Sequence, residues 1–114
     1  MIQSGCAADH PIHPKAREAI RRFPKEARIR LGRGLFRLQL GDQLGMPNSR
    51  PMPGVAAGVS ELRVKGEDGS FRAFYYTASS QGVLVFHAFA KKTQRTPPLE
   101  IELGRKRLKE LLDE

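Results

Sequence analysis

Residues 59–89 read VSELRVKGEDGSFRAFYYTASSQGVLVFHAF, and this stretch decides the fold. Apolar Leu62 and Val64 alternate with charged neighbours, and a period of two is typical of a strand with one buried face. Turn-forming residues follow at 66–69 and again at 79–82, and each turn leads into another strand-like segment. The pattern predicts three antiparallel strands in sequential order, at 59–65, 71–77 and 83–89.

The segments on either side of the first two strands differ sharply in composition. The upstream segment, 41–58, contains Pro47, Pro51, Pro53 and four glycines, which predicts a long connecting loop without regular structure. The last predicted strand, 83–89, is apolar along almost its whole length, which is typical of a strand buried on both faces. We therefore expect this strand to occupy a central position in the sheet.

Two helices are predicted before the loop, because apolar residues recur there with the three- and four-residue spacing of one helix face. The first ends at Phe23, and the second begins at Pro24 and extends to about Leu40. Gly32 and Gly34 weaken the middle of the second helix. The residues of the two apolar stripes are Ala16, Ala19, Ile20 and Phe23, and then Ala27, Leu31, Leu35 and Leu38.

A third helix is predicted after the sheet. Thr96 can cap it, the prolines at 97–98 can open it, and it extends to about Asp113. The elements together predict an α+β fold, in which a small antiparallel or mixed sheet carries an N-terminal helical hairpin on one face and a C-terminal helix. The chain is expected to form one domain over 1–114, with residues 1–14 forming a short first strand or remaining disordered.

Positive charge is concentrated in the two N-terminal helices. The formal net charge is +8 and the pI is near 10.3, and residues 15–37 contain nine basic and two acidic side chains. The segment 38–90 is neutral by count. Such a field attracts polyanions, so it indicates an RNA or DNA surface, an acidic protein partner or a solvated helical face. Arg30, Arg33 and Arg37 share one face of the second helix.

Several classes of protein are disfavoured by what the chain lacks. Its apolar stretches are too short to cross a bilayer and its first residues do not resemble a secretory leader, so a cytoplasmic protein without membrane contact is expected. A single cysteine cannot form an internal disulfide. Cys6, Asp9, His10 and His13 have a metal-like spacing, but one thiol in a proline-broken terminus is a poor zinc site. We expect neither a metal nor another cofactor.

Four blocks of sequence carry a resemblance that composition alone does not provide. They are FPKEAR at 23–28, GVSELRV at 58–64, FRAFYY at 71–76 and VFHAFAKKTQRTP at 85–97. The last block is the most specific, because an aromatic-bearing strand that ends in Lys-Lys-Thr-Gln before a proline and a helix is an unusual combination. From about residue 16 onward the chain resembles toxins of the RelE/HigB superfamily of type II toxin–antitoxin systems, in the branch related to small phage-derived proteins.

The resemblance implies a fold, an activity and a set of partners. It implies a RelE/ParE-like sheet covered by helices on one side, with an open side that receives mRNA in the ribosomal decoding site. The implied activity is that of an mRNA interferase, a metal-independent endoribonuclease in which an RNA 2′-hydroxyl attacks the adjacent phosphodiester and leaves a cyclic phosphate, so that translation is inhibited. The implied partners are mRNA, the ribosome and a cognate antitoxin, a helix-turn-helix protein whose acidic or apolar segments would cover basic surface.

The resemblance also assigns candidate catalytic residues. Arg72 matches the arginine of the second strand motif and would hold the scissile phosphate through two hydrogen bonds. Lys91 and Lys92 match the basic pair after the last strand and would neutralise the developing charge. His87 matches a histidine of HigB-like members, and its ordinary pKa lies near neutrality. The tyrosine that RelE carries beyond the basic turn is missing from 94–98, so the general base stays open.

Further residues are candidates for contact with RNA. Side chains two apart on a strand share a face, so Tyr76 and Phe89 are placed to stack on RNA bases near the catalytic candidates. Basic side chains on the first predicted strand and on the second helix would contact the phosphate backbone. These basic candidates are Arg63, Lys65, Arg30, Arg33 and Arg37.

Each assignment has a plainer alternative. His87 can be a hydrogen-bonded core histidine, and Phe89 can belong to the core. Arg72 can pair with Glu61 or Glu67 across the hairpin. For the function, the alternatives are a ParE-like protein or a degenerate toxin that only binds its antitoxin, and a basic nucleic-acid-binding module whose surface lies on the helices. Convergence of the four catalytic candidates in space would favour the enzyme.

Overall fold

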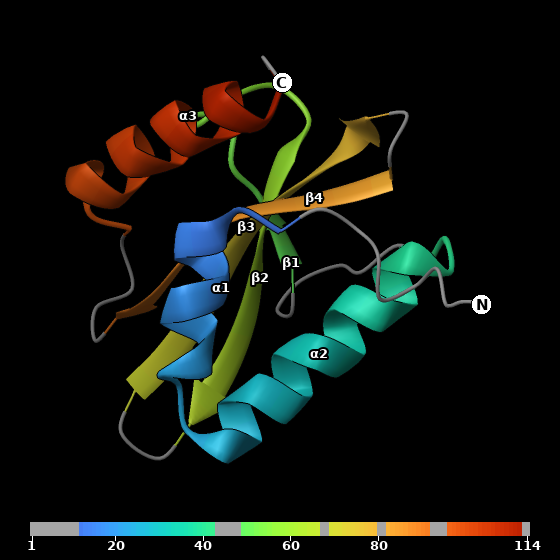
Figure 1. Ribbon diagram of the computed structural model, residues 1–114, viewed down its shortest axis with the longest axis vertical. Helices are drawn as coiled ribbons and strands as arrows, with labels where there is room; N and C mark the ends of the chain where they lie inside the picture. Colours follow the sequence, from blue (N-terminus) through green and yellow to red (C-terminus); the bar gives the residue numbers. More distant parts are fainter. Residues whose placement is uncertain (1–11, 43–48, 67–68, 80–81, 92–95, 113–114) are drawn as a thin grey trace.

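The sheet at the centre of the molecule has four antiparallel strands in the order β1-β2-β3-β4, with helices on both faces. A computed structural model describes residues 12–42, 49–66, 69–79, 82–91 and 96–112. Figure 1 shows the strands between α2 and α3. The predicted α+β class is confirmed. The elements are α1 (Pro14–Arg21), α2 (Lys25–Gln39), β1 (Ser49–Pro51), β2 (Val59–Gly66), β3 (Gly69–Ser79), β4 (Gly82–Lys91) and α3 (Pro98–Leu112).

The three predicted strands are present and pair in sequential order. The register places Arg63 opposite Arg72 and Arg72 opposite Phe89. The prediction that 41–58 has no regular structure is wrong, because β1 lies within that segment and pairs with β2. Its last residue, Pro51, lies on the outer strand, where a missing backbone N–H interrupts no ladder between two strands.

Among the described residues β4 is the outer strand on the other side of the sheet, so the central position expected for it is not found there. Its free edge meets Ile12 in a parallel bridge at Val85, and the His13 N–H donates to the Val85 carbonyl at 2.8 Å. The strand is nevertheless buried on both faces, because α1 packs on one and α3 on the other. Its apolar run therefore reflects two covering helices. The short first strand or disorder expected for 1–14 falls largely on residues 1–11, which lie outside the described residues.

A β-bulge in β4 directs two consecutive side chains to one face of the sheet. The pairing shifts between Phe74 and Tyr75 of β3, so that Phe74 faces His87 while Tyr75 faces Val85, and Phe86 is the extra residue. Phe86 packs in the core on the α3 side, and the His87 ring also bonds to α3. The bulge thus provides two anchors for this helix.

The sheet separates two cores. The core on one face comes from α1 and α2, as predicted for the helical hairpin, and includes Leu31 and Leu35 against Leu62. The other face, which the resemblance implied to be open, is covered in part by α3, with Phe74 and Leu108 in its core. None of the described helices is long and apolar enough to span a membrane.

Two glycines determine how closely the helices approach the sheet. A Cβ atom on Gly34 of α2 would lie 2.9 Å from the Leu62 side chain, and one on Gly104 of α3 would lie 2.8 Å from the Phe74 ring. Both distances are shorter than a normal carbon–carbon contact. The glycine that weakens helix propensity in the middle of α2 therefore allows close packing, and the helix continues through it.

Candidate functional site

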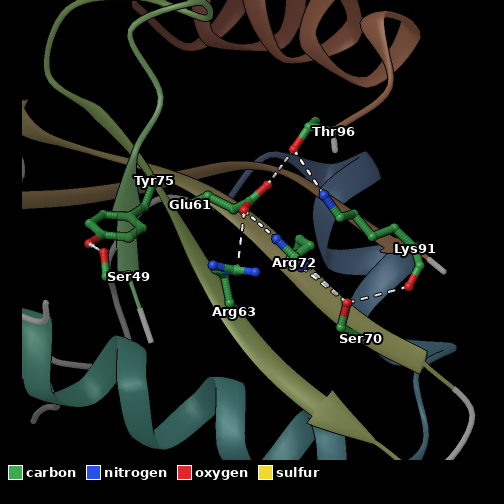
Figure 2. A network of polar contacts seen from close by, with 8 residues as sticks. All are labelled: Ser49, Glu61, Arg63, Ser70, Arg72, Tyr75, Lys91 and Thr96. Carbon is green, nitrogen blue, oxygen red and sulfur yellow. Dashed lines mark hydrogen bonds and ion pairs between the residues drawn. The ribbon is translucent and has the colours of Figure 1, made fainter. Parts of the chain in front are cut away.

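A buried carboxylate, Glu61, lies at the centre of a polar cluster on the α3 side of the sheet (Figure 2). It is 1% exposed. Arg72 Nη1 donates to its Oε1 at 2.6 Å, and Thr96 Oγ1 donates to its Oε2 at 3.0 Å. Arg63 Nε lies 3.8 Å from Oε1. Because burial strips a carboxylate of its hydration, these hydrogen bonds and ion pairs replace the lost contacts with water.

Sheet geometry brings the cluster together from three strands. Glu61 and Arg63 are two residues apart on β2, so their side chains share a face. Arg63 lies opposite Arg72 on β3, and Ser70 of β3 lies opposite Lys91 on β4. Alternation along each strand and register between strands therefore place one carboxylate among three cations.

The Arg72 guanidinium is held in one orientation. In addition to its ion pair with Glu61, its Nε and Nη2 atoms both donate to Ser70 Oγ at 3.2 Å. Arg72 is only 3% exposed, so this candidate for contact with a phosphate is buried. The physical reason is the opposite charge on the neighbouring strand, which offsets the loss of hydration. The pairing with Glu61 considered as an alternative is present.

Lys91 reaches the same carboxylate indirectly. Its Nζ donates to Thr96 Oγ1 at 3.3 Å, and Thr96 in turn donates to Glu61 (Figure 2). Burial lowers the pKa of Lys91, the positive charge of Arg72 lowers it further, and Glu61 partly opposes both effects. An ammonium with a lowered pKa gives up its proton more readily than an exposed lysine.

Positive charge exceeds negative charge in this cluster. Arg50, Arg63, Arg72 and Lys91 are close enough to influence one another electrostatically, and Glu61 is the acidic group that acts on them. Desolvation and the charge of Arg72 lower the pKa of Arg63, which remains a cation near neutral pH. A partly dehydrated group of cations with one counter-charge attracts anions, and phosphate is the anion whose geometry the guanidinium fork fits.

His87 lies on the same face of the sheet but is bonded to α3. Its Nε2 is 2.7 Å from Glu100 Oε1, and its Nδ1 is 2.6 Å from Arg107 Nη1. A guanidinium has donors only, so Nδ1 accepts from Arg107 and Nε2 carries the proton that is donated to Glu100. The ring stacks on Phe89 with 5.3 Å between ring centroids. Both nitrogens of the neutral imidazole are therefore used in holding α3.

The pKa of His87 is lowered from its ordinary value. Burial is the largest cause, and the positive charge of Arg107 adds to it, while Glu100 acts in the opposite direction through its hydrogen bond and its charge. The shift agrees with a neutral ring that accepts a hydrogen bond from a cation. The structure thus places His87 in the setting of a hydrogen-bonded core histidine.

The two aromatic candidates for base stacking differ in exposure. Phe89 is buried and packs edge-on against Phe74, with ring centroids 5.4 Å apart. This corrects its assignment to an RNA-contacting surface, since a ring in the core offers no free face to a base. Tyr76 is half-buried at the margin of the same core.

The basic candidates at the surface form two groups. Lys65 is exposed at the end of β2, and Arg30 of α2 donates from Nη1 to the Lys65 carbonyl at 2.8 Å, which joins the two elements. The second group is Arg33 and Arg37, which follow Arg30 on α2. Arg33 is exposed, and Arg37 pairs with Asp42 at 3.2 Å. Of these, Lys65 and Arg30 border the end of the sheet that carries the Glu61 cluster.

Some candidates lie outside the described residues or lead to no site. Lys92 lies outside them, and so do Cys6, Asp9 and His10. His13 is described: its Nδ1 accepts from the Lys15 N–H at the start of α1, and its Nε2 is 2.7 Å from Glu110 of α3. Among the described residues, no three His, Cys, Asp or Glu side chains are grouped as metal ligands.

Sequence reasoning missed several members of the cluster. Glu61 was considered only as a pairing partner of Arg72, although it organises the cluster, and Ser70 and Thr96 were not considered for it. The available signal was Glu61 itself, an acidic residue on the strand face that also carries Arg63. Ser70 and Thr96 carry no comparable signal, because their roles depend on register and on how the chain enters α3.

The fold and a family match place the chain in a class of protein. A four-stranded antiparallel sheet with α1 and α2 on one face and α3 on the other is compatible with a RelE-like fold. The family described as Phage derived protein Gp49-like (DUF891) matches residues 18–109, and the chain belongs to this family. It is a toxin-like family of toxin–antitoxin systems, related to HigB and RelE, which implies an antitoxin partner. Comparison with curated proteins gives no match.

Proposed function

We propose that the protein is an mRNA interferase of the RelE/HigB type, which cleaves mRNA on the ribosome and is neutralised by an antitoxin. The observation that carries the proposal is the cluster of Arg63, Arg72 and Lys91 around the buried carboxylate of Glu61. Cleavage by a 2′-hydroxyl requires a base that takes the proton of the attacking hydroxyl, cations where negative charge develops on the phosphate, and an acid that protonates the leaving 5′-oxygen. The cluster contains groups suited to the second and third tasks, and the hydroxyl proton passes to solvent water.

The residues divide these tasks according to exposure and charge. Lys65 is exposed and Arg63 is the more exposed of the two arginines bound to Glu61, so both would meet the RNA backbone first. Arg72, oriented by Glu61 and Ser70, would stabilise the charge that builds on the phosphate. Lys91, with its lowered pKa, would give a proton to the 5′-oxygen that leaves. His87 acts in this proposal as a positioning residue for α3.

The test is primer extension on mRNA in purified translating ribosomes, with and without the protein. We expect new 3′ ends that carry a cyclic phosphate. Arg63→Gln is the informative variant because Arg63 is partly exposed and Arg72 continues to neutralise Glu61 without it. We expect cleavage to fall by roughly 10- to 150-fold, because the variant loses a charge-assisted hydrogen bond to the RNA backbone, which is worth about 1.5–3 kcal/mol.

The matched control is Arg22→Gln. Arg22 is an exposed residue at the C-terminal end of α1, and it forms an ion pair with Glu18 at 2.9 Å. α1 packs on the face of the sheet opposite the Glu61 cluster. The substitution should leave cleavage unchanged. Cleavage by the Arg63→Gln variant at the wild-type rate, with both proteins folded, would contradict the proposal.

A second candidate is a catalytically degenerate toxin that acts by protein binding. It is favoured by the burial of Arg72, Lys91 and Glu61, which limits their contact with RNA. The bonding of both His87 nitrogens to α3 favours it as well, because neither nitrogen is then free for proton transfer. The same assay separates the candidates. Growth inhibition on expression without any cleavage of ribosome-bound mRNA would select the degenerate toxin.

A further inference from the structure

We propose that the outer face of α2 is a docking surface for an acidic amphipathic helix of a partner protein. Its apolar part consists of Ile29 and Phe36 of α2 and of Leu40, the residue that caps the C-terminus of the helix, and is called the outer stripe below. The inference rests on the proposed function in one respect, since the antitoxin is the partner that such a toxin must bind. It goes beyond that function by locating the partner away from the Glu61 cluster.

The outer stripe follows helical spacing on the side of α2 that faces away from the sheet. Its residues are separated by seven and four positions, and the buried residues Leu31 and Leu35 lie on the opposite side of the helix. The exposed fractions are 44% for Ile29, 52% for Phe36 and 65% for Leu40. Over about 16 Å of helix, three large apolar side chains therefore lie in contact with water.

Isolated exposed apolar residues are common, but a row of them on one helix face marks an interaction site. Gly32 adds to this row, because a Cβ placed on it would meet no atom within 4 Å. A glycine beside apolar side chains leaves room for another backbone to approach. The surface thus has the form that a partner helix requires.

Charge on α2 determines the chemistry of the partner. The helix has five basic side chains and one acidic side chain, Glu26. Arg33 lies exposed between Ile29 and Phe36, and Arg37 borders the same face. A partner helix with apolar residues on one face and carboxylates beside them would satisfy both the apolar and the basic groups.

The same charges disfavour the two other occupants. A second copy of the chain that paired α2 against α2 would bring arginine against arginine across the two-fold axis, which is repulsive. RNA would use the arginines but not Ile29 and Leu40, because aliphatic side chains offer nothing to a phosphate backbone. An acidic helix is the occupant that uses the whole surface.

The position of α2 predicts how such a partner would act. α2 packs on one face of the sheet, whereas the Glu61 cluster lies on the other face with α3 (Figures 1 and 2). A helix bound to the outer stripe would not contact Arg72 or Lys91. It would oppose docking of the toxin on its target by its bulk and negative charge.

The test uses defined peptides and the full chain. The probe is a fluorescent helical peptide of about 18 residues with leucines on one face and glutamates beside them, long enough to span the outer stripe. A second peptide has lysine in place of each glutamate. The protein variants are the triple substitution Ile29→Ser, Phe36→Ser and Leu40→Ser, and a control, Leu99→Ser with Leu112→Ser, which removes comparably exposed leucines from α3.

We expect the glutamate peptide to bind the wild-type chain, with an affinity that falls as salt is raised, and the lysine peptide not to bind. The triple variant should bind at least roughly tenfold more weakly, a factor that corresponds to about 1.4 kcal/mol. The α3 control should bind as the wild type does. The single substitution Arg33→Glu, at an exposed position, should weaken binding as well. It tests the inference if the triple variant fails to fold.

Several results would overturn the inference. They are absence of binding by the glutamate peptide, equal binding of the lysine peptide, loss of binding in the α3 control alone, and displacement of the peptide by a short oligouridylate. Dimerisation of the wild type that the triple variant abolishes would assign the surface to a second copy. The proposed function is tested independently, because mRNA cleavage by the wild-type chain is measured in the absence of peptide. Peptide binding without cleavage would therefore contradict the proposed function and leave the docking surface supported.

Discussion

At the scale of single residues, the ion pair of Arg72 and Glu61 joins stability to the proposed chemistry. Each is nearly fully buried, and their charged atoms approach to 2.6 Å. Such a pair adds little stability over a well-packed apolar pair, but the loss of one member leaves the other charged and without its main partner. A variant designed to remove catalysis at Arg72 therefore also lowers the stability of the fold.

We expect Arg72→Ala to lower the free energy of unfolding by about 3–5 kcal/mol, as measured by urea denaturation, because it strands the buried Glu61 carboxylate. Arg22→Ala, which breaks the exposed pair with Glu18, should cost no more than about 1 kcal/mol.

A double variant decides whether the ion pair is the cause. Glu61→Gln combined with Arg72→Ala should be less destabilised than the sum of the two single changes, because neither charge is then left alone. Additive losses would show that packing, rather than charge, dominates at this position.

At the scale of elements, the approach of α3 to the sheet depends on Gly104. We expect Gly104→Ala to destabilise the protein, since its new methyl group would overlap the ring of Phe74, and overpacking a core costs roughly 1–3 kcal/mol. The gain in helix propensity, about 1 kcal/mol, does not offset the upper part of this range.

Gly32→Ala on α2 is the matched change in open space. Nothing lies within 4 Å of its new Cβ, so only the helix propensity acts and we expect a gain of up to about 1 kcal/mol. Thermal melting of the two variants should therefore shift in opposite directions. Equal shifts would contradict the close packing of α3 at Gly104.

The attachment of α3 through His87 should depend on pH. The pKa of His87 in the folded protein lies below 6.5, so the unfolded chain takes up the proton more readily. Protonation therefore favours the unfolded chain, and the free energy of unfolding falls as pH decreases below about 6.5. The fall is at most about 1.4 kcal/mol per pH unit, and it ends where His87 of the folded protein is also protonated. His87→Gln, which keeps a donor and an acceptor, should lose this part of the pH dependence in urea denaturation at a series of pH values.

The elements that follow from local pattern were predicted well, and those that depend on contacts were not. Period-two alternation and turn residues predicted β2, β3 and β4 to within two residues, as the helical spacing did for α2. β1 was missed because its three residues have no pattern of their own and exist through pairing with β2. β4 is the outer strand of the described sheet although its sequence is apolar almost throughout, because helices that cover both faces bury a strand whether or not it is central.

At the scale of the whole molecule, the two faces of the sheet are expected to serve different partners. Arg63 belongs to the Glu61 cluster, and Lys65 lies two residues farther along β2. The outer stripe belongs to α2, which packs on the other face of the sheet. We expect Arg63→Gln with Lys65→Gln to reduce the slope of log affinity for single-stranded RNA against log salt by about 0.7 per lost phosphate contact. Arg33→Gln should leave that slope nearly unchanged. The reverse result, measured by fluorescence anisotropy, would move the RNA surface to α2.

The candidate site was predicted in part, for reasons of geometry. Arg72 and Lys91 share a strand face with Arg63, which alternation and register make predictable. The separation of His87 from them was not predictable, because it depends on Glu100 and Arg107, which reach the ring only once α3 has packed on the sheet. Side-chain partners that come from distant elements leave no pattern along the chain.

The bulge in β4 has a consequence for comparing this chain with its relatives. Before it, odd-numbered residues such as Val83 and Val85 face the α1 and α2 side, and after it the even-numbered Ala88 does. The extra residue therefore acts as a change of phase within a single strand. A relative with one residue fewer at this point would keep all other inward and outward positions, provided that its gap is placed at Phe86. If the gap were placed only a few residues away, the positions between the two placements would be assigned to the wrong face.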